Sequence, residues 1–150
     1  MSLSAQDRAR RIKIILFDVD GVLTDGTIWV IPAPVAGPDG AITTRMVEAK
    51  GFNAHDGAGV SLARLGGLKL GIITRRISET VATRARDLKL EFVYQGEAIK
   101  MRPVREIMKK EGVTLEEIAY VGDDVIDLPV MRECGFAVAV PGLPGRRALP

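Results

Sequence analysis

The sequence predicts an α/β fold with a Rossmann-like, mainly parallel sheet flanked by helices. Short apolar runs recur along the chain, and most are separated by segments with helical character, an alternation that is typical of βαβ units. The runs are apolar at consecutive positions, as expected of strands buried on both faces. The predicted strands are Ile12–Phe17, Leu68–Ile73, Phe92–Tyr94, Ile118–Val121 and Phe136–Val140.

Length and composition limit the possible classes of protein. The 150 residues, of which 47% are hydrophobic, predict one domain over residues 1–150, because chains divide into separate cores only at greater length. The single Cys134 excludes an internal disulfide framework and fits a reducing compartment. A net charge of +2 argues against nucleic-acid binding. No stretch reaches the ~18 apolar residues of a membrane span, so we expect a cytoplasmic protein without nucleic-acid or membrane partners.

The segments between the apolar runs carry helix boundary signals. Near the N-terminus the basic run that starts at Arg8 is interpreted as a solvated leader. Further along, glycines, prolines and hydroxyl side chains stand where helices typically begin and end. We expect helices over 58–65, from Ser78 towards Leu88, from Pro103 to Gly112 and from Pro129 to Gly135, with a capping-box turn over 114–117.

The segment from about residue 27 to residue 50 departs from the alternation and predicts a β-hairpin flap. An apolar run is followed by the turn-forming stretch Pro32–Gly40 and then by alternating residues over Ala41–Val47. We expect Pro32 and Pro34 to weaken strand pairing near the tip. A hairpin inserted here would project above the strand ends, which is where ligands bind in α/β sheets.

Two carboxylates directly follow the first predicted strand. Asp18 and Asp20 are two residues apart, and Gly21 permits the turn that would bring both to one site. Mg²⁺ is commonly held by one or two carboxylates together with water and substrate phosphate. One aspartate could attack phosphorus while its neighbour transfers a proton to the leaving alcohol. The alternative is a turn that these residues merely cap.

A second carboxylate cluster follows another predicted strand, at Asp123, Asp124 and Asp127. Close carboxylates repel one another, so a bound cation explains the cluster best, although helix capping competes for Asp127. Thr74 also follows a strand, where its hydroxyl could donate to a phosphate oxygen, and Lys100 could offer a positive charge to the same group.

In this order, the motifs resemble those of the haloacid dehalogenase superfamily of phosphatases. The four motifs are DVDG at Asp18–Gly21, Thr74, Lys100 and GDDVID at Gly122–Asp127. Further stretches, LTDG at 23–26, FNAHDG at 52–57, YQG at 94–96 and AYVGDD at 119–124, narrow the resemblance. Together they are similar to 3-deoxy-D-manno-octulosonate 8-phosphate phosphatases and to relatives that act on nonulosonate 9-phosphates. The resemblance covers about residues 12–140.

The resemblance implies a capless, Mg²⁺-dependent phosphomonoesterase that hydrolyses a phosphorylated sugar acid, with 3-deoxy-D-manno-octulosonate 8-phosphate as the first expectation and a nonulosonate 9-phosphate as the alternative. The first substrate would link the protein to lipopolysaccharide biosynthesis. A homotetramer in which the hairpins assemble near one another is also implied.

Roles for individual residues follow from the same resemblance. Asp18 would be the nucleophile that becomes an aspartyl phosphate, and Asp20 the general acid and then base. Asp18, the backbone carbonyl of Asp20 and Asp123 would bind Mg²⁺, while Thr74 and Lys100 would hold the phosphoryl group. Asp124 and Asp127 would support the site by orienting Lys100 or by completing the outer metal shell.

Three further positions, Arg76, Arg75 and His55, are assigned to substrate binding. Arg76 matches an arginine expected to meet the sugar acid, and His55 falls at a loop position that often carries a basic residue near the substrate. For His55 a solvated loop histidine is an equal alternative.

Three features depart from the family pattern. Arg75 stands where the family commonly has glycine, so it could strengthen anion binding or crowd the pocket. Residues 141–150 look like a short irregular tail. The hairpin looks long and rich in proline, which weakens assignment of the exact sugar; its Trp29 is interpreted as a packed aromatic.

Two other function classes compete with the phosphatase. A non-catalytic oligomeric binding module would explain Arg75 and the short tail. The unaltered Asp18, Asp20, Lys100 and Asp123 argue against it. A receiver-type phosphorelay domain also uses aspartates, a threonine and a lysine. It places its acidic pair and its phospho-acceptor on different strands, so the adjacent Asp18 and Asp20 disfavour it.

Overall fold

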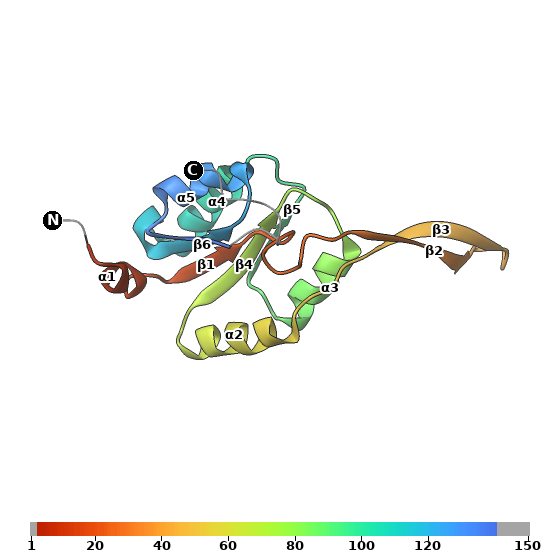
Figure 1. The fold of residues 1–150 in the computed structure, drawn as a ribbon, viewed down its shortest axis with the longest axis horizontal. Helices are drawn as coiled ribbons and strands as arrows, with labels where there is room; N and C mark the ends of the chain where they lie inside the picture. The colour runs from red at the N-terminus through yellow and green to blue at the C-terminus, as the bar shows by residue number, and fades with distance from the viewer. Residues whose placement is uncertain (1–2, 141–150) are drawn as a thin grey trace.

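A computed structural model describes residues 3–140, and the tail expected at 141–150 lies outside these residues. Its main sheet has five parallel strands in the order β5-β4-β1-β6-β7 (Figure 1). The strands are β1 Ile14–Phe17, β4 Lys69–Thr74, β5 Phe92–Gln95, β6 Ile118–Gly122 and β7 Phe136–Ala139. The predicted α/β class and all five predicted strands are confirmed.

The register of the sheet brings three strand ends to one edge. Phe17, the last residue of β1, pairs with Ile72 of β4 on one side and with Val121 of β6 on the other. Because these strands are parallel, the residues that follow them emerge at the same edge, which is where open α/β sheets bind ligands. The central strand β1 therefore delivers its loop between those of β4 and β6.

Helices cover both faces of the sheet (Figure 1). On one face α4 Met101–Glu111 and α5 Leu128–Glu133 pack on the even-numbered side chains of β1, and on the other α2 Ala54–Leu65 and α3 Glu79–Asp87 pack on the odd-numbered ones. The alternation follows from the two-residue period of a strand. It explains why β1 is apolar at every position.

Several helix boundaries differ from the prediction. A short helix α1, Ala5–Ala9, was not predicted; it is capped by Ser4 and overlaps the start of the exposed basic run at Arg8. Helix α2 begins earlier than expected because the Asn53 side chain accepts a hydrogen bond from the backbone N–H of His55 at 2.9 Å. Ser78 precedes α3 as expected, but its side chain makes no capping bond. Two 3₁₀ turns complete the elements, Leu115–Glu117 at the predicted capping box and Val125–Asp127.

The predicted hairpin is present, but its strands are longer than expected. β2, Trp29–Ala36, pairs antiparallel with β3, Ile42–Ala49, along their full lengths, so Pro32 and Pro34 lie inside a paired strand rather than in a turn. Alternate residues of a strand turn their N–H groups to the same edge. In a two-stranded ribbon one edge of each strand is unpaired. Two prolines spaced by two can therefore both face that edge, where the N–H group that proline lacks would form no hydrogen bond between the strands. The turn itself is confined to 37–41.

The hairpin extends away from the five-stranded sheet (Figure 1). Trp29 is 61% exposed, so the interpretation of a packed aromatic is wrong for the isolated chain.

Within residues 3–140, no helix combines the length and apolar character that crossing a membrane would require.

Candidate active site

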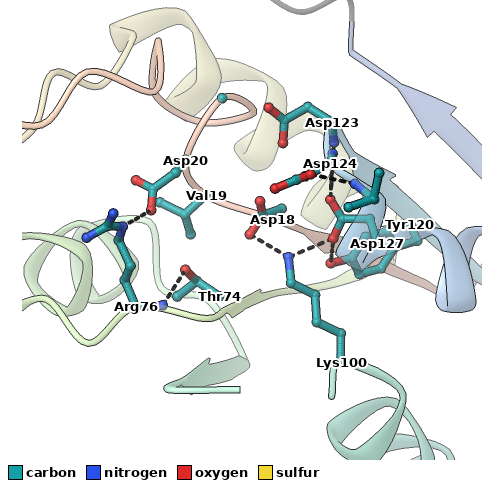
Figure 2. A network of polar contacts seen from close by, with 12 residues as sticks. Asp18, Val19, Asp20, Thr74, Arg76, Lys100, Tyr120, Asp123, Asp124 and Asp127 are labelled. Carbon is teal, nitrogen blue, oxygen red and sulfur yellow. Dashed lines mark hydrogen bonds and ion pairs between the residues drawn. The ribbon is translucent and has the colours of Figure 1, made fainter. Parts of the chain in front are cut away.

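The centre of the site is a buried chain of charges formed by Asp18, Lys100 and Asp127. Asp18 directly follows β1, and its backbone N–H donates to the carbonyl of Val121 at 2.9 Å. Lys100 Nζ lies 2.7 Å from Asp18 Oδ1 and 2.6 Å from Asp127 Oδ1 (Figure 2). All three side chains are buried. A buried ammonium is retained only where charges compensate it, and these two carboxylates provide that compensation.

Asp127 holds Lys100 in place and has no capacity left for a metal ion. Its Oδ1 accepts from Lys100 Nζ and from the Tyr120 hydroxyl at 2.7 Å, and its Oδ2 accepts from the backbone N–H groups of Asp123 and Asp124, both at 3.2 Å. A carboxylate has about four acceptor sites. Of the two supporting roles considered for Asp127, this geometry fits the orientation of Lys100.

For Asp124 the structure shows a different position from that of Asp127, at the start of the 3₁₀ turn. Its carboxylate is exposed and accepts from the backbone N–H of Val125 at 2.6 Å, which makes it the cap of the 3₁₀ turn. Its own backbone N–H donates to Asp127. Asp124 therefore shapes the loop that presents Asp127, whereas the contact with Lys100 belongs to Asp127 itself.

The carboxylates of Asp18 and Asp123 fit a hard cation. Oxygen atoms of Asp18, Asp123 and Asp127 lie within 4.8 Å of one another, and hard cations prefer such oxygen ligands. The loop after β1 approaches so closely that a Cβ on Gly21 would lie 2.0 Å from Asp123 Oδ2, and Gly21 has φ +97°. With Asp127 already saturated, Asp18 and Asp123 are the two carboxylates of this group that are suited to direct coordination.

Burial controls the protonation of two groups. It raises the pKa of Asp18 above the ordinary value of 3.8, against the opposing effect of the Lys100 ammonium. Burial, together with the charge of Asp127, also raises the pKa of Tyr120 far above its ordinary range. The Tyr120 hydroxyl therefore stays protonated and donates to Asp127 under all working conditions.

Thr74 and Arg76 lie on the β4 side of the site (Figure 2). Thr74 ends β4 and is buried, and its Oγ1 accepts from the backbone N–H of Arg76 at 3.3 Å. Arg76 extends towards Asp20, with Nε 3.6 Å from Asp20 Oδ2. The side chain of Arg75 is exposed.

His55 lies in the first turn of α2 and is exposed. We expected His55 in a loop, and this is wrong because the Asn53 cap starts α2 at Ala54. The charge network just described does not include it.

Two buried residues in this region were not singled out from the sequence. Tyr120 lies in the apolar run that forms β6, and nothing in the sequence indicated that its hydroxyl donates to Asp127. Lys50 follows β3, and its fully buried ammonium contacts Asp20 Oδ1. A lysine at the end of an alternating strand resembles an ordinary surface residue, so only the position of the hairpin base beside the loop after β1 reveals it.

The fold and this arrangement of residues define a haloacid dehalogenase-like hydrolase, and the chain belongs to that family. The family model described as haloacid dehalogenase-like hydrolase matches residues 41–140.

Within the family, the chain is similar to 3-deoxy-D-manno-octulosonate 8-phosphate phosphatases. It is 36% identical over 140 residues to the enzyme of Escherichia coli (strain B / BL21-DE3), covering 93% of this chain and 68% of the relative. For the enzyme of Yersinia pestis the identity is 35% over 133 residues, covering 89% and 65%. The chain thus spans about two thirds of the length of these curated relatives.

Solved structures agree with this placement. The phosphatase of this name from Moraxella catarrhalis, in complex with magnesium ion, phosphate ion and a KDO molecule, superposes with a TM-score of 0.76 at 36% identity and covers 92% of this chain and 72% of that one. A cobalt-bound form of the Haemophilus influenzae phosphatase gives a TM-score of 0.75 at 32% identity, covering 91% and 73%.

Proposed function

We propose that the protein is a Mg²⁺-dependent phosphomonoesterase that hydrolyses 3-deoxy-D-manno-octulosonate 8-phosphate. The observation that carries the proposal is the buried Asp18–Lys100–Asp127 chain, next to a carboxylate pair suited to a hard cation. Such a site serves phosphoryl transfer, in which catalysis is mostly positioning and charge stabilisation. The named relatives and the Moraxella complex support the choice of sugar acid.

In the first half-reaction Asp18 attacks phosphorus. The bond between phosphorus and the sugar oxygen breaks, Asp20 donates a proton to that oxygen, and an aspartyl phosphate forms on Asp18. Lys100, fixed by Asp127, stands beside the carboxylate and offers its charge to the transferred group. Thr74 Oγ1 supplies a hydroxyl from the end of β4.

In the second half-reaction water attacks the phosphorus of the aspartyl phosphate, Asp20 takes the proton from that water, and the bond to Asp18 breaks. Phosphate leaves and the free carboxylate is restored. Asp18, Asp123 and the backbone carbonyl of Asp20 would hold Mg²⁺, which neutralises phosphate charge and orients the phosphoryl group when bound.

Substrate selection is assigned to Arg76, whose guanidinium lies at the exposed side of Asp20 and is suited to a sugar-acid carboxylate. Arg75 and His55 stay secondary candidates for substrate binding. Arg75 is exposed just after β4, and His55 is exposed in the first turn of α2.

We also propose a homotetramer that assembles through the hairpins. Apolar side chains are exposed on both faces of the ribbon, with Trp29 and Ile31 on one face and Val30 and Met46 on the other. An isolated two-stranded ribbon is marginally stable in water, and large exposed apolar patches mark association surfaces. Sedimentation equilibrium should give four times the chain mass, and a strict monomer would contradict the assembly.

The cytoplasm is the proposed compartment, since the single Cys134 fits a reducing environment.

The test of function is phosphate release from three substrates with and without Mg²⁺. 3-Deoxy-D-manno-octulosonate 8-phosphate should be hydrolysed with a higher kcat/KM than a nonulosonate 9-phosphate or an aryl phosphate, and a chelator should abolish the activity. Preference for the nonulosonate would transfer the assignment to the nine-carbon substrate. No release from any substrate would contradict the phosphatase and favour a binding module.

A further inference from the structure

Lys50 is a buried cation that the mechanism above does not use. It follows β3 at the base of the hairpin, and its side chain is 0% exposed. Its ammonium contacts Asp20 Oδ1 and lies 3.6 Å from Glu48 Oε1. A lysine is seldom withdrawn from water unless its charge is compensated. Asp20 and Glu48 both provide that compensation, so the buried charge fixes the geometry of the Asp20 carboxylate.

The two oxygens of Asp20 have different surroundings. Oδ1 accepts from the buried Lys50, whereas Oδ2 faces Arg76, whose side chain is 55% exposed and lies 3.6 Å away. The buried Lys50 therefore holds Oδ1 of the carboxylate from the protein interior, and Oδ2 faces the exposed side of the site. Such a constraint limits rotation of a side chain that is itself only partly buried.

The backbone around Lys50 is fixed by two neighbouring segments. The Thr80 hydroxyl on α3 donates to the carbonyl of Glu48 at 3.0 Å. Thr24, in the loop after β1, forms an isolated antiparallel bridge with Phe52. The loop that carries Asp20 and the segment that carries Lys50 are thus tied side by side, so Lys50 keeps a constant position relative to Asp20.

We propose that Lys50 is a positioning residue for proton transfer by Asp20. The proposal rests on the proposed phosphatase function. Lys50 holds Asp20 Oδ1 so that the carboxyl group meets the oxygen of the leaving alcohol as the bond to phosphorus breaks. A leaving alkoxide needs this proton, whereas an aryl oxide is stable enough to leave with little help. A general acid or base typically contributes about 10²–10⁴-fold to rate, and misplacement of Asp20 would lose part of that factor.

The experiment compares kcat/KM of Lys50→Met and Lys50→Arg with wild type on three phosphate esters. They are 3-deoxy-D-manno-octulosonate 8-phosphate, glycerol 3-phosphate and 4-nitrophenyl phosphate. This ratio reports the steps up to departure of the leaving group and excludes hydrolysis of the intermediate. We expect Lys50→Met to lose about tenfold or more on both alkyl esters and little on the aryl ester. Lys50→Arg should recover most of the loss because it keeps the charge and donors.

Lys69→Met is the matched control, because Lys69 forms an ion pair with Glu111 at the opposite end of β4 and is half exposed. It should leave all three values unchanged. Lys50→Gln, which retains an N–H donor, is measured in parallel and replaces Lys50→Met if the latter folds poorly. Thermal unfolding checks that each variant is folded.

Three results would overturn the proposal. Equal losses on alkyl and aryl esters would assign Lys50 a structural role, a loss confined to the sugar acid would make it a substrate contact, and unchanged values would remove it from the reaction. The wild-type values judge the proposed function separately, because they depend on no variant.

Discussion

At the scale of single residues, Asp127 connects folding with the chemistry of the site. It accepts from Tyr120 and Lys100 and from two backbone N–H groups, and it is completely buried. From the sequence, Asp127 was considered as part of a cation-binding cluster, as a helix cap, or as the residue that orients Lys100, and the structure fits the last of these. Only the fold reveals that its acceptor sites are filled, because the tyrosine and the lysine come from β6 and from the loop before α4.

Tyr120→Phe should destabilise the fold and lower kcat. The change leaves a buried carboxylate short of one donor, at a cost of about 1–3 kcal/mol, and loosens the group that orients Lys100. Urea unfolding and steady-state kinetics measure the two effects. Tyr94→Phe, at a partly buried position on β5, is the control. Equal destabilisation of both variants would contradict the role assigned to Tyr120.

Asp18→Asn should abolish turnover and change how stability depends on pH. Burial raises the pKa of Asp18 above 3.8 in the folded state, so the contribution of Asp18 to the stability of the fold falls as pH rises from that value through the folded pKa. Asparagine does not ionise and removes this loss. The stability of the variant minus that of wild type should therefore increase across this window and then level off. Unfolding of metal-free protein at a series of pH values measures it, and a decreasing difference would contradict the raised pKa.

At the scale of elements, the central strands β1, β4 and β6 were predictable because burial on both faces leaves a nearly uninterrupted apolar signal. The hairpin was predictable in place but not in detail, since the edge used by Pro32 and Pro34 depends on the ribbon's pairing. Lys50 was missed for a similar reason. Its partner Asp20 lies 30 positions away in the chain, and no local pattern predicts that contact.

The loop after β1 depends on glycine at position 21, and Gly21→Ala should weaken Mg²⁺ binding and activity. A Cβ there would lie 2.0 Å from Asp123 Oδ2, in addition to the strain of φ +97°. Gly67→Ala isolates the strain, because Gly67 has φ +83° with open space around its Cβ position. The strain alone should cost each variant about 1–2 kcal/mol of stability, and Gly21→Ala should lose more because Asp123 must also move. Mg²⁺ titration of activity should separate them, and equal Mg²⁺ affinities would contradict the close approach to Asp123.

At the scale of the whole molecule, the hairpin carries the exposed apolar surface on which the proposed assembly depends. Its apolar residues lie on a ribbon that extends from the sheet (Figure 1). The core, in contrast, encloses the charged side chains of Asp18, Lys100 and Asp127 within one chain. The structure brings together Asp18, Lys100 and Asp127, which the sequence had singled out; their catalytic roles stay predictions. Assembly depends on contacts between surfaces, which a single sequence does not predict.

Charge on the hairpin should dissociate the assembly. Ile42 is 76% exposed and Met46 is 63% exposed, so Ile42→Lys combined with Met46→Lys places like charges in the proposed interface. Sedimentation velocity should show a smaller species than wild type. Leu65→Lys, at an 85% exposed position at the end of α2, should leave the mass unchanged. An unchanged mass for the hairpin variant would contradict assembly through the ribbon.

The central claim, that Asp18 carries the phosphoryl group, is tested most directly by intact-protein mass spectrometry of the acid-quenched enzyme during turnover of 3-deoxy-D-manno-octulosonate 8-phosphate with Mg²⁺. Asp20→Asn, supplied with 4-nitrophenyl phosphate because an aryl oxide leaves with little help from an acid, should accumulate one added phosphoryl group, since the hydrolysis step lacks its base. Peptide mapping should locate that group at Asp18. The double variant with Asp18→Asn should carry none. A phosphoryl group on another residue, or turnover by a folded Asp18→Asn variant, would contradict the mechanism.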